Sequence, residues 1–184
     1  MNFKNKTLTF VLAAGMSLNL AACGQTKSNE TDHSGHDHLA SKEENVNMES
    51  GISKQQAQKI LSAYLKIKDA LVETDGVAAS SAAKELLPML ADSEDDLIKK
   101  LKSDAEHIMD SKDAAHQRDH FNILSDNVYA LLKSTSANEN TIYRQYCPMA
   151  MSNSGAFWLS TEKEIYNPYF GDKMLHCGSV KEEL

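Results

Sequence analysis

The chain has 184 residues, with 26 acidic against 19 basic side chains and a formal net charge of −7. This acidic balance, without a basic stripe, excludes nucleic acid as an expected partner. The length suffices for one domain with a hydrophobic core, preceded by a leader and a polar segment.

The first 23 residues have the pattern of a bacterial export signal. Lys4 and Lys6 precede an uncharged, mostly apolar stretch at residues 8–20, which is too short for a membrane-spanning helix. The stretch ends in Leu20-Ala21-Ala22-Cys23-Gly24, which resembles the lipobox of bacterial lipoproteins. We therefore expect a signal peptide at residues 1–22 and a lipid on Cys23. The alternative is an ordinary signal peptide, in which Cys23 is incidental.

These features predict a location in the cell envelope, with the protein held on a membrane by its lipid and facing the periplasm or the exterior. Gly24, and not an aspartate, follows the cysteine. In a Gram-negative cell, this pattern resembles that of lipoproteins destined for the outer membrane.

Residues 23–50 are polar and are predicted to form a disordered tether. Within them lie three imidazoles, those of His33, His36 and His38. Such a tract can capture Cu(II), Zn(II) or Ni(II) without fixed geometry. A solvated linker without metal is the other interpretation.

Residues 51–184 are expected to form the folded domain. Apolar residues at steps of three and four predict a first helix that starts at Ser53 and stops at Asp75-Gly76. A second helix is expected at residues 77–90, shortened by Pro88, a third opening at Ser93, and a fourth from Asp113. Short connections favour an up-down four-helix bundle. Residues after Ser134 show no helical period, so we predict an all-α fold with a loop-rich C-terminal cap.

Two sulfur-rich clusters lie in this cap. Cys147-Pro148-Met149-Ala150-Met151 should be extended after its proline, so that Cys147, Met149 and Met151 share a face. The second cluster is Met174-Leu175-His176-Cys177. Thiolates and thioethers are the ligands that Cu(I) prefers. The residues leave two alternatives open, a metal site and a disulfide between the thiols.

The predicted fourth helix carries His116 and His120, which are four residues apart and so lie on one face. They form either a metal-binding pair or two partly exposed polar residues. His107 has no partner at helical spacing and is expected at the surface.

The C-terminal half resembles an uncharacterised family, domain of unknown function 3347, which is found in exported proteins and at the C-terminus of heavy-metal efflux adaptor proteins of the copper and silver type. The matching residues are Arg118-Asp119-His120-Phe121, Leu124-Ser125, Cys147-Pro148-Met149-Ala150, Trp158-Leu159-Ser160, Asn167-Pro168-Tyr169-Phe170-Gly171 and Met174-Leu175-His176-Cys177-Gly178. The resemblance implies a helical bundle and copper handling, with Cys147, Met149, Met174, Cys177 and His120 as ligands. Met151, His116 and His176 are further candidate ligands on the residues alone, and the ligands implied by the resemblance do not include them.

The Asn167–Gly171 segment is also expected to be a structural corner, with Gly171 at positive φ and the two aromatic rings packing the cap on the bundle. No catalytic motif is apparent, so we expect no enzyme. The expected function is a lipoprotein that binds copper as Cu(I), or a similar soft metal, for buffering or for transfer to an efflux adaptor or pump. The alternative is a structural or interaction domain with a Cys147–Cys177 disulfide and no metal.

Overall fold

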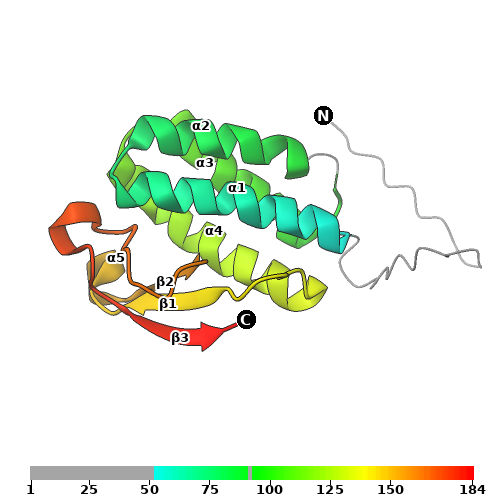
Figure 1. The fold of residues 1–184 in the computed structure, drawn as a ribbon. Coiled ribbons are helices and arrows are strands. Elements are labelled where there is room, and N and C mark those ends of the chain that lie inside the picture. Colours follow the sequence, from blue (N-terminus) through cyan, green and yellow to red (C-terminus); the bar gives the residue numbers. More distant parts are fainter. Residues whose placement is uncertain (1–51, 91–92) are drawn as a thin grey trace, which may run out of the picture. The chain divides into compact units, whose positions relative to one another are not determined.

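The computed structural model describes residues 52–90 and 93–184 (Figure 1). The predicted signal peptide, the predicted lipid attachment at Cys23 and the histidines of the predicted tether, His33, His36 and His38, lie outside the described residues. Within these two ranges no helix is both long and apolar enough to cross a membrane.

The first part of the domain is helical. Its elements are α1 (Lys54–Val72), α2 (Gly76–Leu86), the 3-10 helix η1 (Leu87–Leu90), α3 (Asp96–Asp110) and α4 (Ala114–Thr135). Each of the four α-helices packs on the next along the chain, and α1 also packs on α4. The four helices therefore form a closed bundle (Figure 1).

Side-chain caps start the helices close to the predicted positions. The Ser53 hydroxyl accepts a hydrogen bond of 3.1 Å from the backbone N–H of Gln56, and Asp75 and Asp113 accept from the first turns of α2 and α4. The third helix differs from the prediction, because Asp95 and not Ser93 caps α3. Pro88 lies in η1, where it ends the regular α-helical hydrogen bonding of α2.

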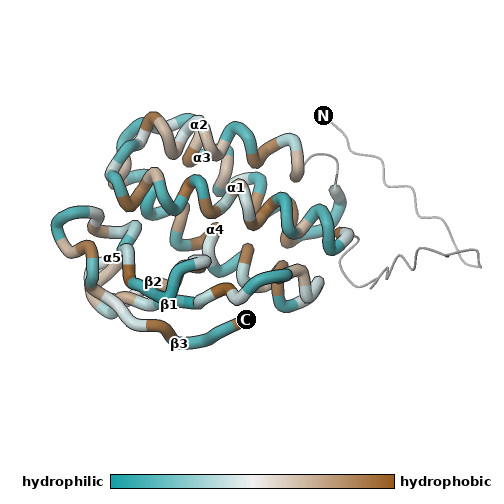
Figure 2. The backbone as a smooth tube through the Cα atoms, in the orientation of Figure 1, coloured by the Kyte–Doolittle hydropathy of each residue, from teal (hydrophilic) through white to brown (hydrophobic). Residues whose placement is uncertain are grey.

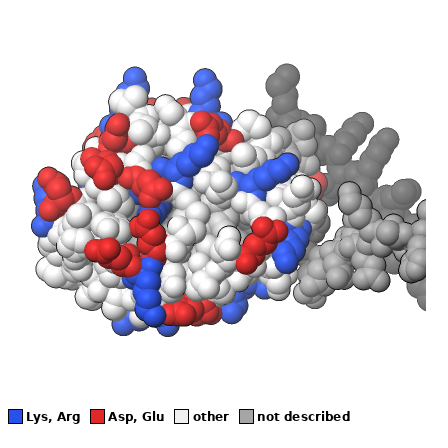
Figure 3. Space-filling view, in the orientation of Figure 1, with Lys and Arg blue, Asp and Glu red and all other residues white. Residues whose placement is uncertain are grey.

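The core of the bundle forms where the apolar stripes of the helices meet (Figure 2). The rings of Tyr64 and Phe121 stack in this core with their centroids 5.2 Å apart. Both rings are fully buried. On the face drawn in Figure 3, basic and acidic side chains interleave and form no continuous basic stripe.

The all-α prediction is wrong, because the C-terminal part contains an antiparallel sheet in place of a loop-rich cap. Its strands are β1 (Tyr143–Cys147), β2 (Ala156–Ser160) and β3 (Ser179–Glu183), in the order β2-β1-β3. Between them lie the short helix α5 (Ala150–Asn153) and the 3-10 helix η2 (Gly171–Met174). Strands of five residues with mixed polar and aromatic side chains give too short a period-2 signal to be recognised in the sequence.

The sheet docks on the bundle through strand β2, which packs on α4. The N–H of Leu159 donates a hydrogen bond of 3.0 Å to the hydroxyl oxygen of Tyr64, and that hydroxyl lies 2.9 Å from Ser125 Oγ. The Ser125 hydroxyl donates in turn to the Phe121 carbonyl, so the Tyr64 hydroxyl is the donor to Ser125. Burial raises the pKa of Tyr64 well above its ordinary value.

Candidate metal sites: a thiol pair and a histidine cluster

The two cysteines of the cap meet in the structure. Cys147 is the last residue of β1, and Cys177 lies two residues before β3. Because β1 pairs with β3 and Tyr146 stands opposite Ser179, the sheet brings both cysteines to the same end. The sulfur atoms are 3.1 Å apart, and both thiols are free. Cys147 is fully buried and Cys177 is half-buried.

The backbone at Cys177 is held by Asn167, which is fully buried. The Asn167 side-chain amide donates a hydrogen bond of 2.7 Å to the Cys177 carbonyl, and its backbone N–H donates one of 2.8 Å to the Leu175 carbonyl. The position of Cys177 is therefore fixed from outside the sheet, by a residue of the Asn167–Gly171 segment.

The proximity of the thiols changes their chemistry. The hydrogen bond with Cys147, and then burial, raise the pKa of Cys177. The separation of 3.1 Å lies between the roughly 2.0 Å of a disulfide and the roughly 3.8 Å expected for two thiolates on one tetrahedral ion with bonds of about 2.3 Å. Small side-chain movements lead from this arrangement to either product.

The methionines do not share an extended face with Cys147, so that prediction is wrong. The strand ends at Cys147, Met149 has helical backbone angles (φ −90°, ψ −12°), and Met151 is left-handed (φ 50°). Met149 is 49% exposed. Met151 and Met174 are partly buried. Ligation by these thioethers remains a prediction.

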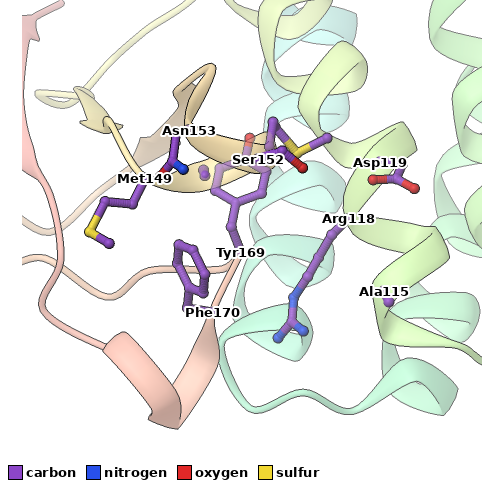
Figure 4. A pocket seen from close by; sticks show the side chains of 10 residues that line it. Ala115, Arg118, Asp119, Met149, Ser152, Asn153, Tyr169 and Phe170 are labelled. Atoms are coloured by element: carbon purple, nitrogen blue, oxygen red, sulfur yellow. The ribbon is translucent and has the colours of Figure 1, made fainter.

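A pocket of about 340 Å³ lies where α5 faces the start of α4 (Figure 4). Met151, Ser152 and Asn153 beside it all have positive φ, which is unusual for residues other than glycine. The side chains of Met149 and Met151 belong to the lining, with Arg118 and Asp119 on the helix side; the remaining lining residues are Ala115, Ala150, Ser152, Asn153, Tyr169 and Phe170.

The Asn167–Gly171 segment is a structural corner, as predicted. The Asn167 side-chain oxygen accepts from the Tyr169 N–H at 2.8 Å, and Gly171 has φ +58°. A side chain at Gly171 would meet the Thr74 hydroxyl and the Val72 carbonyl. Tyr169 is buried, with its ring 5.8 Å from that of Phe121, whereas Phe170 is only partly buried.

Three histidines gather on the bundle. His116 and His120 lie one turn apart on α4, as predicted, and His107 of α3 faces them. One nitrogen from each ring can be chosen so that all three lie within 4.8 Å of one another. The rings of His107 and His120 are stacked with centroids 4.1 Å apart, and those of His116 and His120 are 4.9 Å apart.

His107 is exposed, as predicted, and has no histidine at helical spacing on α3. Its neighbours His116 and His120 belong to the following helix, so spacings of three and four within one helix do not reveal them. The predicted antiparallel packing of the third helix on the fourth was the feature that could have placed His107 beside His116 and His120. His176 is also exposed, and its Nδ1 lies 2.9 Å from the Ile165 carbonyl oxygen.

The thiol pair and the histidine cluster have separate surroundings. The histidines of α4 contact Asp104 and His107 on α3, and α3 packs on α2, η1 and α4. The thiols contact each other within the sheet region. The chain therefore offers a soft sulfur pair and a group of imidazoles as two distinct candidate sites.

A comparison with known families places part of the chain in the range of a family model. Residues 60–140 match the model of a family described as "Protein of unknown function (DUF3347)", which confirms the expected domain over that range. The matched range runs from α1 through α4 and ends before β1, so it includes the three histidines and excludes both thiols. Neither the curated proteins nor the solved structures gave a match to this chain.

Proposed function

We propose that this protein binds copper as Cu(I), or a similarly soft metal ion, through Cys147 and Cys177 in the cell envelope. The observation that carries the proposal is the approach of these two thiols to 3.1 Å although they are 30 residues apart in sequence. Two thiolates are strong ligands for a soft monovalent ion, and both thiols lie at the same end of the sheet.

The thiol pair suits an ion that must be bound and released. Cys147 is fully buried, while Cys177 is half-buried and therefore the more accessible of the two thiols to an entering ion. The raised pKa of Cys177 means that an entering cation displaces a proton. Met149 and Met174 stand close to the cysteines in sequence and are proposed as weaker thioether ligands during entry.

The proposed location rests on the lipobox-like sequence at Cys23. A lipid on that residue would hold the domain on a membrane, and the histidines at positions 33, 36 and 38 would collect divalent metal from solution near it. The family resemblance adds the suggestion of a partner, since related domains are fused to heavy-metal efflux adaptors. Buffering of copper, or transfer to such an adaptor or pump, is the proposed role.

A Cys147–Cys177 disulfide is the second candidate. The same short sulfur separation favours it, and the compartment outside the cytoplasm is oxidising. The bond would tie β1 to the segment that precedes β3, and the domain would then have a structural or interaction role without metal.

The deciding experiment is competition for Cu(I) against a chromophoric chelator under anaerobic, reducing conditions. Both proteins carry Asn in place of His33, His36 and His38. The protein that keeps the wild-type Cys147 and Cys177 should bind one Cu(I) more than the Cys147→Ser, Cys177→Ser variant. Bound Cu(I) should also protect both thiols of the wild type from alkylation. Equal affinity in the two proteins, or a Cys147–Cys177 bond that reductant cannot open, would refute the copper proposal.

A further inference from the structure

We propose that His107, His116 and His120 form a second metal site, on the helical bundle, for a divalent ion of borderline softness such as Zn(II) or Cu(II). This site does not depend on the thiol pair, because the two groups share no described contact. Imidazole nitrogen is the ligand that Zn(II) and Cu(II) prefer, whereas the thiol pair suits a softer ion.

The helical hairpin sets the ligand geometry. The end of α3 runs beside the start of α4, so His107 faces the two histidines that lie one turn apart on α4. The three ligand atoms lie within 4.8 Å of one another. A tetrahedral ion with Zn–N bonds of about 2.1 Å needs nitrogens about 3.4 Å apart. His107 and His116 are exposed, so their rings have room to rotate towards this spacing.

A buried carboxylate orients the third ligand. Asp104 is 7% exposed, and its Oδ1 lies 3.4 Å from Nδ1 of His120. Burial raises the pKa of Asp104, and the contacts with His120 and His107 oppose that rise. With Nδ1–H directed at the carboxylate, Nε2 of His120 is left to bind the ion. A bound cation would in turn stabilise the buried charge of Asp104.

The backbone between the ligands is fixed by Gln117, which is fully buried. Its side-chain amide donates hydrogen bonds to the carbonyls of Ile108 at 3.0 Å, Ser111 at 2.8 Å and Gly76 at 2.8 Å. It therefore ties the end of α3 and the start of α2 to the first turn of α4. A site held in this way loses little conformational entropy when an ion binds.

The arrangement leaves a coordination position open to solvent. Three histidines fill three positions of a tetrahedral ion, and two of the three side chains are exposed. Water or a ligand from another molecule would complete the shell. Such a site exchanges its ion more readily than a closed structural site with four protein ligands.

The test measures Zn(II) binding by competition with a chromophoric chelator. The parent protein is the mature chain without its lipid, in which Cys147 and Cys177 are Ser, and His33, His36 and His38 are Asn. We expect one Zn(II) per chain in the parent, and no binding at this site in the His107→Asn, His116→Asn, His120→Asn variant. His176→Asn is the matched control, because His176 is exposed and lies outside the cluster, and it should bind as the parent does.

Two further measurements make the result specific. Asp104→Asn keeps all three rings and should weaken Zn(II) binding about 10- to 100-fold, the usual effect of losing a carboxylate behind a ligating histidine. Cu(II) bound to the parent should give an electron paramagnetic resonance spectrum with coupling to several nitrogens. If the triple variant does not fold, these two measurements still test the proposed site. A parent that binds no Zn(II), or a folded triple variant that binds as tightly as the parent, would overturn the proposal.

Discussion

Nε of Arg118, on α4, donates a hydrogen bond of 2.7 Å to the carbonyl oxygen of Pro168 in the Asn167–Gly171 corner. Nη2 of the same guanidinium donates to the Leu71 carbonyl at 3.0 Å and to the Thr74 hydroxyl at 2.8 Å. One side chain therefore joins α4, the end of α1 and the corner whose Asn167 holds Cys177. Burial lowers the pKa of Arg118, but a guanidinium keeps its charge in proteins.

Replacing Arg118 should destabilise the domain. Arg118→Met should lower the free energy of unfolding by about 2–3 kcal/mol, because three carbonyl and hydroxyl acceptors lose a charged donor. Urea unfolding measures the change. The matched control is Lys173→Met, at an exposed position of η2, which should change stability by no more than about 0.5 kcal/mol. Equal effects of the two substitutions would show that the Arg118 contacts add nothing.

The two aromatic residues of the corner should differ in their contributions. Tyr169 is buried and its hydroxyl donates a hydrogen bond of 2.6 Å to the Phe157 carbonyl, so Tyr169→Ala should cost about 3–5 kcal/mol. The Phe170 ring is only partly buried, so Phe170→Ala should cost less than about 2 kcal/mol. Thermal or urea unfolding of both variants checks the order. A larger loss for Phe170 would mean that its exposed edge packs on something else in solution.

Stability should fall at alkaline pH because of Tyr64. Its pKa is raised by burial in the folded state, so its contribution is complete below pH 10, the unfolded pKa, and is lost as the pH rises towards the folded pKa. Between these two pKa values, titration of one such hydroxyl lowers the free energy of unfolding by about 1.4 kcal/mol per pH unit. Urea unfolding at pH 9, 10 and 11 should give a shallower decline for Tyr64→Phe than for wild type. Tyr169→Phe should reduce the decline as well, since burial also raises the pKa of Tyr169. Unchanged slopes in both variants would contradict this account.

The thiols should react in a fixed order. Iodoacetamide should label half-buried Cys177 before fully buried Cys147. The hydrogen bond with Cys147 is the main cause of the raised pKa of Cys177, so Cys147→Ala should lower that pKa and speed labelling of Cys177 at neutral pH. Peptide mass spectrometry over a range of pH values measures both effects. Slower labelling in Cys147→Ala would be inconsistent with the described contact.

Cys23→Ala tests the anchor. Without the lipobox-like cysteine, lipid attachment and processing of the leader should both fail, and the precursor should accumulate. Fractionation of cells followed by mass measurement of the N-terminus checks this outcome. His33→Ala is a suitable control, since it leaves the sequence around Cys23 unchanged. A mature, membrane-bound Cys23→Ala protein would refute the lipoprotein proposal.

The sequence predicted the bundle well because the relevant signals are local. Ser53 and Asp113 mark helix starts through contacts within three residues, and Pro88 ends a helix through its own ring. Asp75-Gly76 was predicted as the stop of the first helix, and Asp75 also caps the start of α2. The sheet was missed because its pairing is non-local. The five residues of β1 are buried only at alternate positions near the end, and nothing in their own sequence specifies β2 or β3 as neighbours.

The candidate sites also show that local relationships were predictable from the sequence and non-local ones were not. His116 and His120 were found by their spacing on one helix, whereas His107 joins them only through the pairing of α3 with α4. The thiols were identified as a pair by their number and compartment. The arrangement of the methionines was not predictable from Pro148, since a turn and the left-handed Met151 follow it.

The hydrogen bond from Leu159 to Tyr64 spans 95 residues, and it has a consequence for the order of folding. Synthesis runs from the N-terminus, so all four helices are made before either Cys147 or Cys177. Helices form through neighbouring residues and fold early, while contacts between distant residues come late. The bundle can therefore form before strand β2 docks on it at Tyr64 and before β1 pairs with β3. Because the β1–β3 pairing is what brings Cys147 to Cys177, the two sulfurs are separate and open to misoxidation until that pairing forms.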